Sequence, residues 1–592
     1  MALPRIIVVG GGLAGLAAVI KIAEAGGAVD LFSIVPVKRS HSVCAQGGIN
    51  AAKNLKGEGD TTWQHFDDTI YGGDFLANQT PVKAMCEAAP AIIDLLDRMG
   101  VPFNRTPEGM LDFRRFGGTL YHRTAFAGAT TGQQLLYALD EQVRRYEAEG
   151  KVRKFEGWEF LSAVIDGKGQ ARGITALNLR TMELRSFPAE ALILATGGIG
   201  AIFGKSTNSV VCTGSAQSAV FQQGAWYANG EFIQVHPTSI PGEDKLRLMS
   251  ESARGEGGRV WVPRAPGDKR PAKQIPEAER FYFLEEWYPK YGNLVPRDVA
   301  TRAIHRVVYE EGLGVDGQPM VYLDLTHIDR ATLDRKLGGI LEIYEKFVGV
   351  DPHVEPMKIF PGMHYTMGGL WVDFNQMTNI PGIFAAGECE YQYHGANRLG
   401  ANSLMSCIYG GFQAGPNALT YAKDLPAADG DGGQAAEVAR QAEINNRLMQ
   451  NQGTENPFKI WRELGNIMTE HAAVIRYNKG LKQADAKIVE LLERYKNVNL
   501  ADRSQWANTS FAFARQLKNM LELARTVVQG ALLRDESRGA HYKPEFPERN
   551  DEKFLKTTKA IFTGDVAGPR FEFEDVDIQY IKPRRRSYDA TK

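Results

Sequence analysis

The sequence predicts an α/β protein that begins with a Rossmann-like βαβ arm. An apolar, β-branched run at residues 6–9 is short enough to be a buried parallel strand. It leads into GGGLAG at residues 10–15, which has the spacing G-x-G-x-x-G, and then into a helical pattern at 13–25 that Gly26 ends. Residues 28–32 form the expected second strand. Because these parts follow in order, the arm indicates a dinucleotide site, and a loop that is glycine-rich for packing alone is the alternative.

Each glycine of the motif has a separate role in such a site. The first allows a tight turn, the second lets the backbone approach a pyrophosphate, and the third lets the helix pack on the strand. The N-terminus of the helix then points amide N–H groups at the phosphates. An acidic residue is expected about 20 residues further on to bind the ribose. Ser33 stands there instead, and a hydroxyl binds a ribose less strongly than a carboxylate does.

Length, charge and cysteine content limit the possible functions. With 592 residues and 43% apolar content, the chain is expected to form about three or four domains. A net charge of −1 gives no reason to expect nucleic acid or direct binding to an anionic membrane. The five cysteines form no C-x-x-C pair, which argues against an internal iron–sulfur cluster and for a reducing compartment. A strand at residue 6 leaves no room for a cleaved signal peptide, and no apolar run reaches 18 residues, so membrane attachment would need a partner.

A motif beyond the βαβ arm carries a family resemblance. Residues 39–49 read RSHSVCAQGGI. This run resembles the flavoprotein subunits of succinate dehydrogenase and quinol:fumarate reductase, in which the histidine carries FAD covalently through the 8α-methyl group of the flavin. His41 is the matching residue here. A loop histidine that only hydrogen-bonds backbone is the alternative reading.

Further family motifs follow in the same order along the chain. A strand and ATGG at residues 191–198 match the second flavoprotein fingerprint, and residues 379–388 match the third, with Glu388 expected near the ribityl hydroxyls. Thr213-Gly214-Ser215 departs from the usual Thr-Gly-Asp. A helix from Asn402 to about Lys423 would face the flavin pyrimidine edge with its N-terminus. The residues expected to bind FAD are Gly10, Gly12, Leu13, Ala14, Gly15, Ser33, Ser40, His41, Ser42, Ala45, Gln46, Gly47, Gly48, Ala195, Thr196, Gly197, Ser215, Glu388, Arg398, Ser403 and Leu404.

The resemblance predicts the domain organisation. We expect a Rossmann-like FAD-binding domain of the fumarate reductase/succinate dehydrogenase type at residues 1–233 and 351–425, interrupted by an α+β capping domain at residues 234–350. A helical domain is expected at residues 434–541 and a C-terminal domain at residues 542–592. The helical domain has its clearest apolar stripe at Ile488, Leu491, Leu492 and Tyr495. A basic cluster at residues 582–586 is interpreted as a solvated or partner-docking surface.

Three residues are candidates for proton transfer. SESARGEGG at residues 250–258 is close to the family's TEGCRGEGG, and Arg297 follows Pro296 at a predicted helix start. The resemblance implies that Arg297 donates the proton to fumarate and that Glu251 and Arg254 relay protons to it; a solvated ion pair is the alternative for those two. A cation at a helix N-terminus is misplaced by a few tenths to about 1 kcal/mol, so Arg297 is not there to stabilise its helix.

Substrate binding is assigned to a second set of residues. A dicarboxylate needs cationic or donor groups at both ends, and arginine can bind a carboxylate through two parallel hydrogen bonds. The expected substrate ligands are Gln234, His236, Ser250, His364 and Arg398. Near the family's substrate site, Phe116 or an adjacent basic residue could also reach the substrate, with surface solvation as an equal alternative.

The resemblance, which spans residues 10–541, implies a function. The chain is expected to be the FAD-containing catalytic subunit that interconverts succinate and fumarate and exchanges electrons with a membrane quinone through an iron–sulfur subunit. Residues 112–118 and 363–373 look most like bacterial members with a di-haem cytochrome b anchor and menaquinone, held at the cytoplasmic face of the cell membrane. L-aspartate oxidase is the nearest rival, although it lacks the flavin-linking histidine. A non-catalytic flavoprotein scaffold is the rival from another class.

Overall fold

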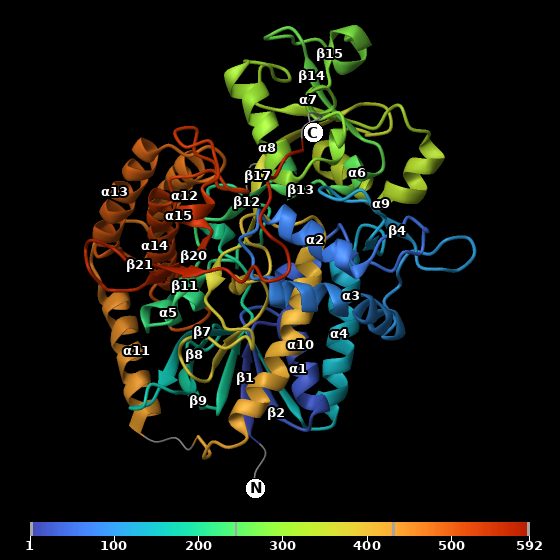
Figure 1. The fold of residues 1–592 in the computed structure, drawn as a ribbon. Coiled ribbons are helices and arrows are strands. Elements are labelled where there is room, and N and C mark those ends of the chain that lie inside the picture. Colours follow the sequence, from blue (N-terminus) through green and yellow to red (C-terminus); the bar gives the residue numbers. More distant parts are fainter. Residues whose placement is uncertain (1–3, 243–245, 429–431, 589–592) are drawn as a thin grey trace.

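The βαβ arm forms the centre of a parallel sheet. The computed structural model describes residues 4–242, 246–428 and 432–588 (Figure 1). Its five-stranded sheet has the order β19-β10-β1-β2-β6, and every pair is parallel. The strands are β1 (Arg5–Val9), β2 (Ala28–Ser33), β6 (Val152–Glu156), β10 (Ala191–Leu194) and β19 (Ile383–Ala385).

Alternate residues of β1 face two different layers, as the pleat of a strand requires. Ile6 and Val8 pack under the helices on one face, whereas Ile7 and Val9 belong to the core on the other face. The first layer contains α1 (Leu13–Glu24), α3 (Gln79–Arg98), α4 (Thr131–Ala148) and α10 (Asn402–Ala422), with α2 (Thr62–Gly72) nearby. The second contains the antiparallel strands β7 (Trp158–Ile165), β8 (Ala171–Asn178) and β9 (Leu184–Pro188), together with α5 (Ser215–Gln222).

The inserted segment forms its own sheet and core, drawn in green at the top of Figure 1. Its six strands have the order β13-β12-β17-β16-β14-β15. They are β12 (Ile233–Ile240), β13 (Arg247–Leu248), β14 (Arg259–Pro263), β15 (Arg280–Phe281), β16 (Val321–Asp324) and β17 (Met357–Thr366). Helices α8 (Arg297–His305) and α9 (Arg330–Val348) pack on this sheet. Because β17 pairs with β12, the sheet continues past residue 350, where the sequence suggested a boundary.

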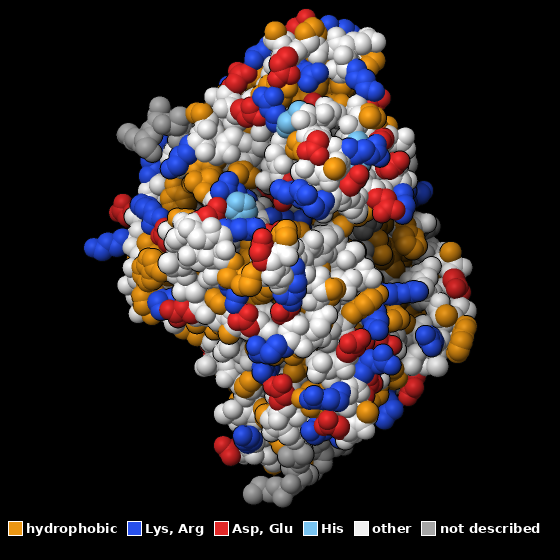
Figure 2. Space-filling view, turned by 90° about the vertical axis from the view of Figure 1, so that its right-hand side faces the viewer, with side chains coloured by type: hydrophobic (Ala, Val, Ile, Leu, Met, Phe, Trp, Pro, Cys, Tyr) orange, Lys and Arg blue, Asp and Glu red, His pale blue; other side chains and the backbone are white. Residues whose placement is uncertain are grey.

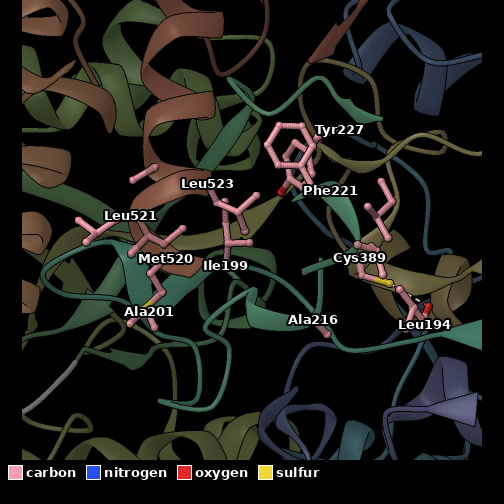
Figure 3. Packing of buried hydrophobic residues seen from close by; sticks show 14 of the residues in the cluster. Leu194, Ile199, Ala201, Ala216, Phe221, Tyr227, Cys389, Met520, Leu521 and Leu523 are labelled. Carbon is pink, nitrogen blue, oxygen red and sulfur yellow. Dashed lines mark hydrogen bonds between the residues drawn. The ribbon is translucent and has the colours of Figure 1, made fainter. Parts of the chain in front are cut away.

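The helical segment packs against the second layer. It consists of α11 (Gly432–Gln450), α12 (Pro457–Ala472), α13 (Asn478–Tyr495) and α14 (Thr509–Leu533). The stripe on α13 is confirmed, because Ile488 and Leu491 are fully buried and their neighbours on that face are partly buried. Figure 3 shows α14 bringing Met520 and Leu523 against Ile199, which ties the helices to the nucleotide-binding layers.

The last part of the chain pairs with the body and then crosses to the inserted segment. Strands β20 (Lys556–Ile561) and β21 (Arg570–Asp575) join β11 (Tyr227–Ala228) and β18 (Gly369–Leu370) in one sheet. The interpretation of residues 582–586 as a solvated or partner-docking basic surface is wrong for Arg586. The Arg586 side chain is 7% exposed and binds Asp298 of α8. The Asp298 carboxylate is buried, and a buried carboxylate is stable only beside a cation.

The surface and the cysteines agree with the bulk composition. On the face drawn in Figure 2, Lys and Arg side chains are interspersed with Asp and Glu. None of the five cysteines, all of them in the described residues, forms a disulfide. Among the described residues, no helix combines the length and apolarity needed to cross a bilayer, and no cluster of His, Cys, Asp and Glu could hold a metal ion.

The close packing of α1 on β1 makes a stability prediction. A Cβ added at Gly15 would lie 1.8 Å from the Gly10 carbonyl oxygen, so Gly15→Ala must move backbone and should lower the free energy of unfolding by about 1–3 kcal/mol. Gly338→Ala in α9 is the matched control, since its Cβ would meet nothing within 4 Å and alanine favours helix. Thermal unfolding measures both variants; equal melting temperatures would contradict the packing argument.

Candidate functional site

A cavity of about 420 Å³ lies at the carboxyl ends of β1 and β2 and extends to the inserted segment. This edge of an open parallel sheet is where α/β proteins bind ligands. All the expected FAD ligands except Gly15 line the cavity, as do His236, Ser250, Glu251, Arg297 and His364. Gly15 lies behind it, packed on Gly10. Gln234 and Arg254 are also set back from the lining.

The lining fits a dinucleotide. Gly10 has φ +118°, and a Cβ there would lie 2.1 Å from the carbonyl oxygen of Ala195, so only glycine permits this turn. The N-terminus of α1 opens directly onto the cavity. Ser40 Oγ, Gln46 Oε1 and Thr196 Oγ1 are buried without a hydrogen-bond partner among the described residues. A ligand with phosphate and hydroxyl groups would satisfy them.

The two serines that replace acidic residues have partners within the chain. Ser33 Oγ donates to the Val35 carbonyl at 2.6 Å, and Ser215 Oγ accepts from Asn519 Nδ2 of α14 at 2.8 Å. Both serines line the cavity, but part of their hydrogen-bonding capacity is used by the protein. Ser215 thus also links α5 to the helical segment.

His41 is held by a loop that the sequence reasoning did not identify. Ser209 donates its backbone N–H to His41 Nδ1 at 3.2 Å, and Asn208 Nδ2 lies 3.0 Å from His41 Nε2. Asn208 also donates to the carbonyl of His364 at 3.0 Å, and so joins the two histidines. The only signal for this loop in the sequence is a polar run, STNS at residues 206–209, shortly after the second fingerprint.

Arg254, Glu251 and Arg297 form one buried chain, as expected. Glu251 Oε1 accepts from Arg254 Nη2 at 2.7 Å, and Oε2 accepts from Arg297 Nε at 2.8 Å. Burial alone would raise the pKa of Glu251, but the two guanidinium groups outweigh it and hold the pKa below its usual value. Glu251 is therefore ionised. Since both its partners are also buried, the alternative of a solvated ion pair is excluded.

Gln234 stands behind the cavity and joins the two arginines that line it. Its Oε1 accepts from Arg297 Nη1 at 3.0 Å, and its Nε2 donates to the carbonyl of Arg398 at 2.8 Å and to Asn397 Oδ1 at 3.0 Å. Both ends of the amide are thus bound to the protein. A role in positioning fits this geometry better than the direct substrate contact that was expected.

Two neutral histidines, His236 and His364, pack edge to face in the cavity lining, with ring centroids 4.9 Å apart. Burial and the charge of Arg297 lower the pKa of His236 and of His364 well below the usual value. Thr207 Oγ1 lies 2.7 Å from His364 Nδ1, and Thr238 donates its N–H to His236 Nδ1 at 3.2 Å. With Nδ1 as acceptor, each ring can donate a hydrogen bond from Nε2.

Arg398 is a buried cation without a carboxylate partner. It is 2% exposed, and the described residues offer it no salt bridge and no hydrogen-bond acceptor for Nε. Its guanidinium carbon lies 4.4 Å from the centroid of the Tyr365 ring. Burial, and then repulsion from Arg297, lower the pKa of Arg398 to about 9, so it remains charged at neutral pH. A bound anion would remove the cost of this unpaired charge.

The negative charge of Glu388 compensates the positive charge of Arg398 only in part. Burial raises the pKa of Glu388 to about 7, although the Thr366 N–H at 3.0 Å and the nearby Arg398 oppose the rise. At neutral pH this carboxyl is therefore partly protonated. A partly protonated carboxyl can both donate to and accept from the hydroxyls of a ligand.

Phe116, and not a neighbouring basic residue, lines the cavity. Arg115 turns outward to Glu58, and Arg114 is buried on the carbonyl of Gly47, to which its Nε donates at 2.9 Å. A Cβ at Gly47 would lie 2.7 Å from the Phe116 ring. Arg114 and the glycine together therefore fix the loop after His41 against this ring.

The unpaired charge of Arg398 makes a binding prediction. Arg398→Ala should weaken malonate binding by about 30-fold or more, because the loss of a buried charge pair costs 2–5 kcal/mol or more. Malonate titrations followed by calorimetry or flavin absorbance measure the effect. Arg115→Ala, which removes a surface arginine, is the control and should leave the Kd within about twofold. An unchanged Kd in Arg398→Ala would contradict the assignment.

Comparison with known proteins identifies the family of this chain. An "FAD binding domain" family model matches residues 5–404, and a "Fumarate reductase flavoprotein C-term" model matches residues 461–588. The chain is 63% identical over 595 residues to the succinate dehydrogenase flavoprotein subunit of Bacillus subtilis (strain 168), with 100% of both chains covered. It is 35% identical to the fumarate reductase flavoprotein subunit of Escherichia coli (strain K12), covering 98% of this chain and 95% of the relative.

Solved structures give the same result. A structure of Escherichia coli quinol fumarate reductase superposes with a TM-score of 0.90 at 33% identity, covering 99% of this chain and 98% of that one. A quinol–fumarate reductase structure with menaquinol molecules gives a TM-score of 0.88 at 33% identity, covering 99% and 100%. The chain belongs to the family of succinate dehydrogenase and fumarate reductase flavoprotein subunits, which are FAD-binding oxidoreductases.

Proposed function

We propose that this chain interconverts succinate and fumarate in the cavity beside Arg297 and Arg398. The observation that carries the proposal is the charge of the site. Three guanidinium groups, Arg254, Arg297 and Arg398, lie close to one fully ionised carboxylate, Glu251, and one partly ionised carboxyl, Glu388, which leaves a net charge between +1 and +2. A four-carbon dicarboxylate dianion neutralises this charge, which supports such a substrate.

The chain's residues bind the substrate and move the proton. His236, Ser250, His364 and Arg398 line the cavity and supply donors to the two carboxylates. FAD, when bound, supplies the two-electron redox chemistry. Arg297 gives a proton to the substrate carbon that does not exchange hydride, or takes it in the reverse direction, and Glu251 and Arg254 return the proton along the chain of 2.8 Å and 2.7 Å contacts. Most of the catalysis then comes from positioning and electrostatics.

The role of Arg297 predicts a loss of turnover without a loss of binding. Arg297→Ala should lower kcat for succinate oxidation with an artificial acceptor by about 10²- to 10⁴-fold, the usual contribution of a general acid–base group. Malonate binding should fall less, because Arg398 remains. Arg306→Ala, an exposed arginine just beyond α8, is the control. Turnover near wild type in Arg297→Ala would disprove the proton route.

We also assign a covalent bond between FAD and His41. His41 lines the cavity, and the N–H of Ser209 at 3.2 Å keeps Nδ1 as a hydrogen-bond acceptor, so we assign the bond to Nε2. Asn208 Nδ2, which lies 3.0 Å from Nε2, would give up that contact when the bond forms, while the Ser209 N–H would still hold the ring through Nδ1. Such a bond would distinguish this chain from an L-aspartate oxidase-like enzyme, which lacks the histidine.

The covalent bond is tested by acid precipitation. Yellow fluorescence should stay with the denatured wild-type polypeptide and should pass into the supernatant for His41→Ala. His122→Ala, which removes a surface histidine bound to Glu58, should behave as wild type. If the wild-type protein released all its flavin, the covalent link would be refuted and the oxidase alternative favoured.

The partners follow from the same assignment. We infer that an iron–sulfur subunit passes the electrons to or from a membrane quinone, which we take to be menaquinone, and that a di-haem cytochrome b subunit holds the complex at the cytoplasmic face of the membrane. The names of two relatives, a succinate dehydrogenase flavoprotein subunit and a quinol–fumarate reductase solved with menaquinol, support an enzyme of several subunits that uses a quinone. Co-purification of an iron–sulfur protein and a haem protein, with identification of the bound quinone, tests it.

A non-catalytic scaffold would not require Arg297, Arg398, His236 and His364 in one cavity.

A further inference from the structure

Residues 577–588 form a strap that begins on the nucleotide-binding body. The Asp577 carboxylate accepts from the backbone N–H of Thr80 at 2.8 Å, and the side-chain oxygen of Gln79 accepts from the N–H groups of Tyr580 and Ile581 at 2.8 Å. Further along, Arg584 binds Asp67 of α2 at 2.6 Å. The first part of the C-terminal strap is thus fixed to α2 and α3. In Figure 1 it is the red chain that runs toward the green inserted segment.

The end of the strap is buried against the inserted segment. Arg586 makes two parallel hydrogen bonds to Asp298 of α8, from Nη1 to Oδ2 at 2.6 Å and from Nη2 to Oδ1 at 2.9 Å. The Asp298 side chain is 1% exposed. Tyr588 packs between Tyr71 of α2 and Tyr291 of the inserted segment, with ring centroids 5.6 Å and 5.1 Å away. The strap therefore connects the two halves of the molecule that face each other across the cavity.

Asp298 follows Arg297 in the sequence, so the strap holds the first turn of α8. The N-cap of this helix, Pro296, makes no side-chain capping bond. Burial would raise the pKa of Asp298, but Arg586 and Arg302 outweigh it and lower the pKa to about 2. Asp298 therefore stays ionised, and the charged, two-bond contact with Arg586 is the tightest link between the strap and α8.

A second contact holds the same helix to the C-terminal part of the chain. Arg302 of α8 donates to the Gly539 carbonyl at 2.8 Å, and the neighbouring Ala540 N–H donates to the Ala396 carbonyl at 2.9 Å. Ala396 lies two residues before Arg398. Gly539 cannot be replaced without moving this segment, since a Cβ there would lie 2.6 Å from the Ala396 carbonyl oxygen.

We propose that the C-terminal strap positions Arg297 for catalysis, with Arg586 as the residue that fixes α8 through Asp298. No strap residue lines the cavity within the described chain, so Arg586 acts through the helix and is a positioning residue. Arg297 is the first residue of α8, and any rotation of that turn moves its guanidinium relative to Glu251. The inference rests on the proposed role of Arg297 in proton transfer.

The test compares two arginines of the strap in the assembled enzyme. Arg586→Ala should lower kcat for succinate oxidation with an artificial acceptor at least tenfold, while flavin content and the Kd of malonate stay within about threefold. Guanidinium ion at low millimolar concentration should restore part of the lost kcat by binding beside Asp298. Arg584→Ala is the matched control: it removes a surface contact of the same strap to α2, and its kcat should stay within twofold, with no response to guanidinium.

Other outcomes would overturn the inference. A kcat within twofold of wild type for Arg586→Ala would be one of them. An equal loss of kcat in Arg584→Ala would be another, because it would mean that the strap only joins the domains. If Arg586→Ala does not assemble, Arg586→Lys decides, because lysine keeps the charge but not the two parallel bonds. It should assemble with normal flavin content and about fivefold lower kcat, and a wild-type kcat would refute the proposal. A wild-type kcat in Arg297→Ala would refute the proposed proton route. A low kcat in Arg297→Ala together with a wild-type kcat in Arg586→Ala would refute only the positioning role of the strap.

Discussion

The site depends on one buried carboxylate shared between two arginines. Glu251 accepts hydrogen bonds from Arg254 on one oxygen and from Arg297 on the other, in a place closed to solvent. Removing one member of such a group leaves an uncompensated buried charge and costs about 3–5 kcal/mol. Two glycines make room for this carboxylate: a Cβ at Gly117 would lie 2.1 Å from Glu251 Oε1, and one at Gly400 would lie 3.2 Å from Oε2. The carboxylate therefore fixes both the charge and the shape of the site.

Because Glu251 and Arg297 belong to the inserted segment and Arg398 to the nucleotide-binding body, the cavity exists only while the two halves are held together. Gln234 contributes to this at the closest point, since its amide bonds Arg297 at one end and the Arg398 carbonyl at the other. Asn208 has a similar role beside the proposed flavin-linking position, where it contacts His41 and the backbone of His364. Neutral amides suit these tasks, because they bridge cations and carbonyl groups without adding charge to a site whose charge must match a substrate.

Local patterns predicted the parts of the fold that depend on neighbours in sequence. The βαβ arm, the helix from Asn402 and the apolar stripe on α13 could be read from periodicity and glycine positions, and family motifs identified about half of the residues that line the cavity. The misses involve partners far apart in the chain. A basic run at residues 582–586 has the same composition whether it faces water or a buried carboxylate, so Arg586 could not be paired with Asp298 in advance. Direct substrate contact by Gln234 stays a prediction, and the contacts at both ends of its amide, with partners far away in the sequence, could not be foreseen.

The arginines already give the cavity a positive charge, so its other hydrogen-bond donors can be neutral. His236 and His364 are uncharged because burial and Arg297 depress the pKa of each, and Arg114 is placed on backbone carbonyls behind Phe116, away from the lining. If either histidine were protonated, the local charge would exceed that of a dianion, and the bound state would contain an unpaired buried cation. In the proposed reaction, two neutral N–H donors and one guanidinium would hold a carboxylate at each end of the substrate, and Arg297 would remain available for the proton. In the proposed function, the lowered pKa values of the two histidines would thus help the site to select a dicarboxylate.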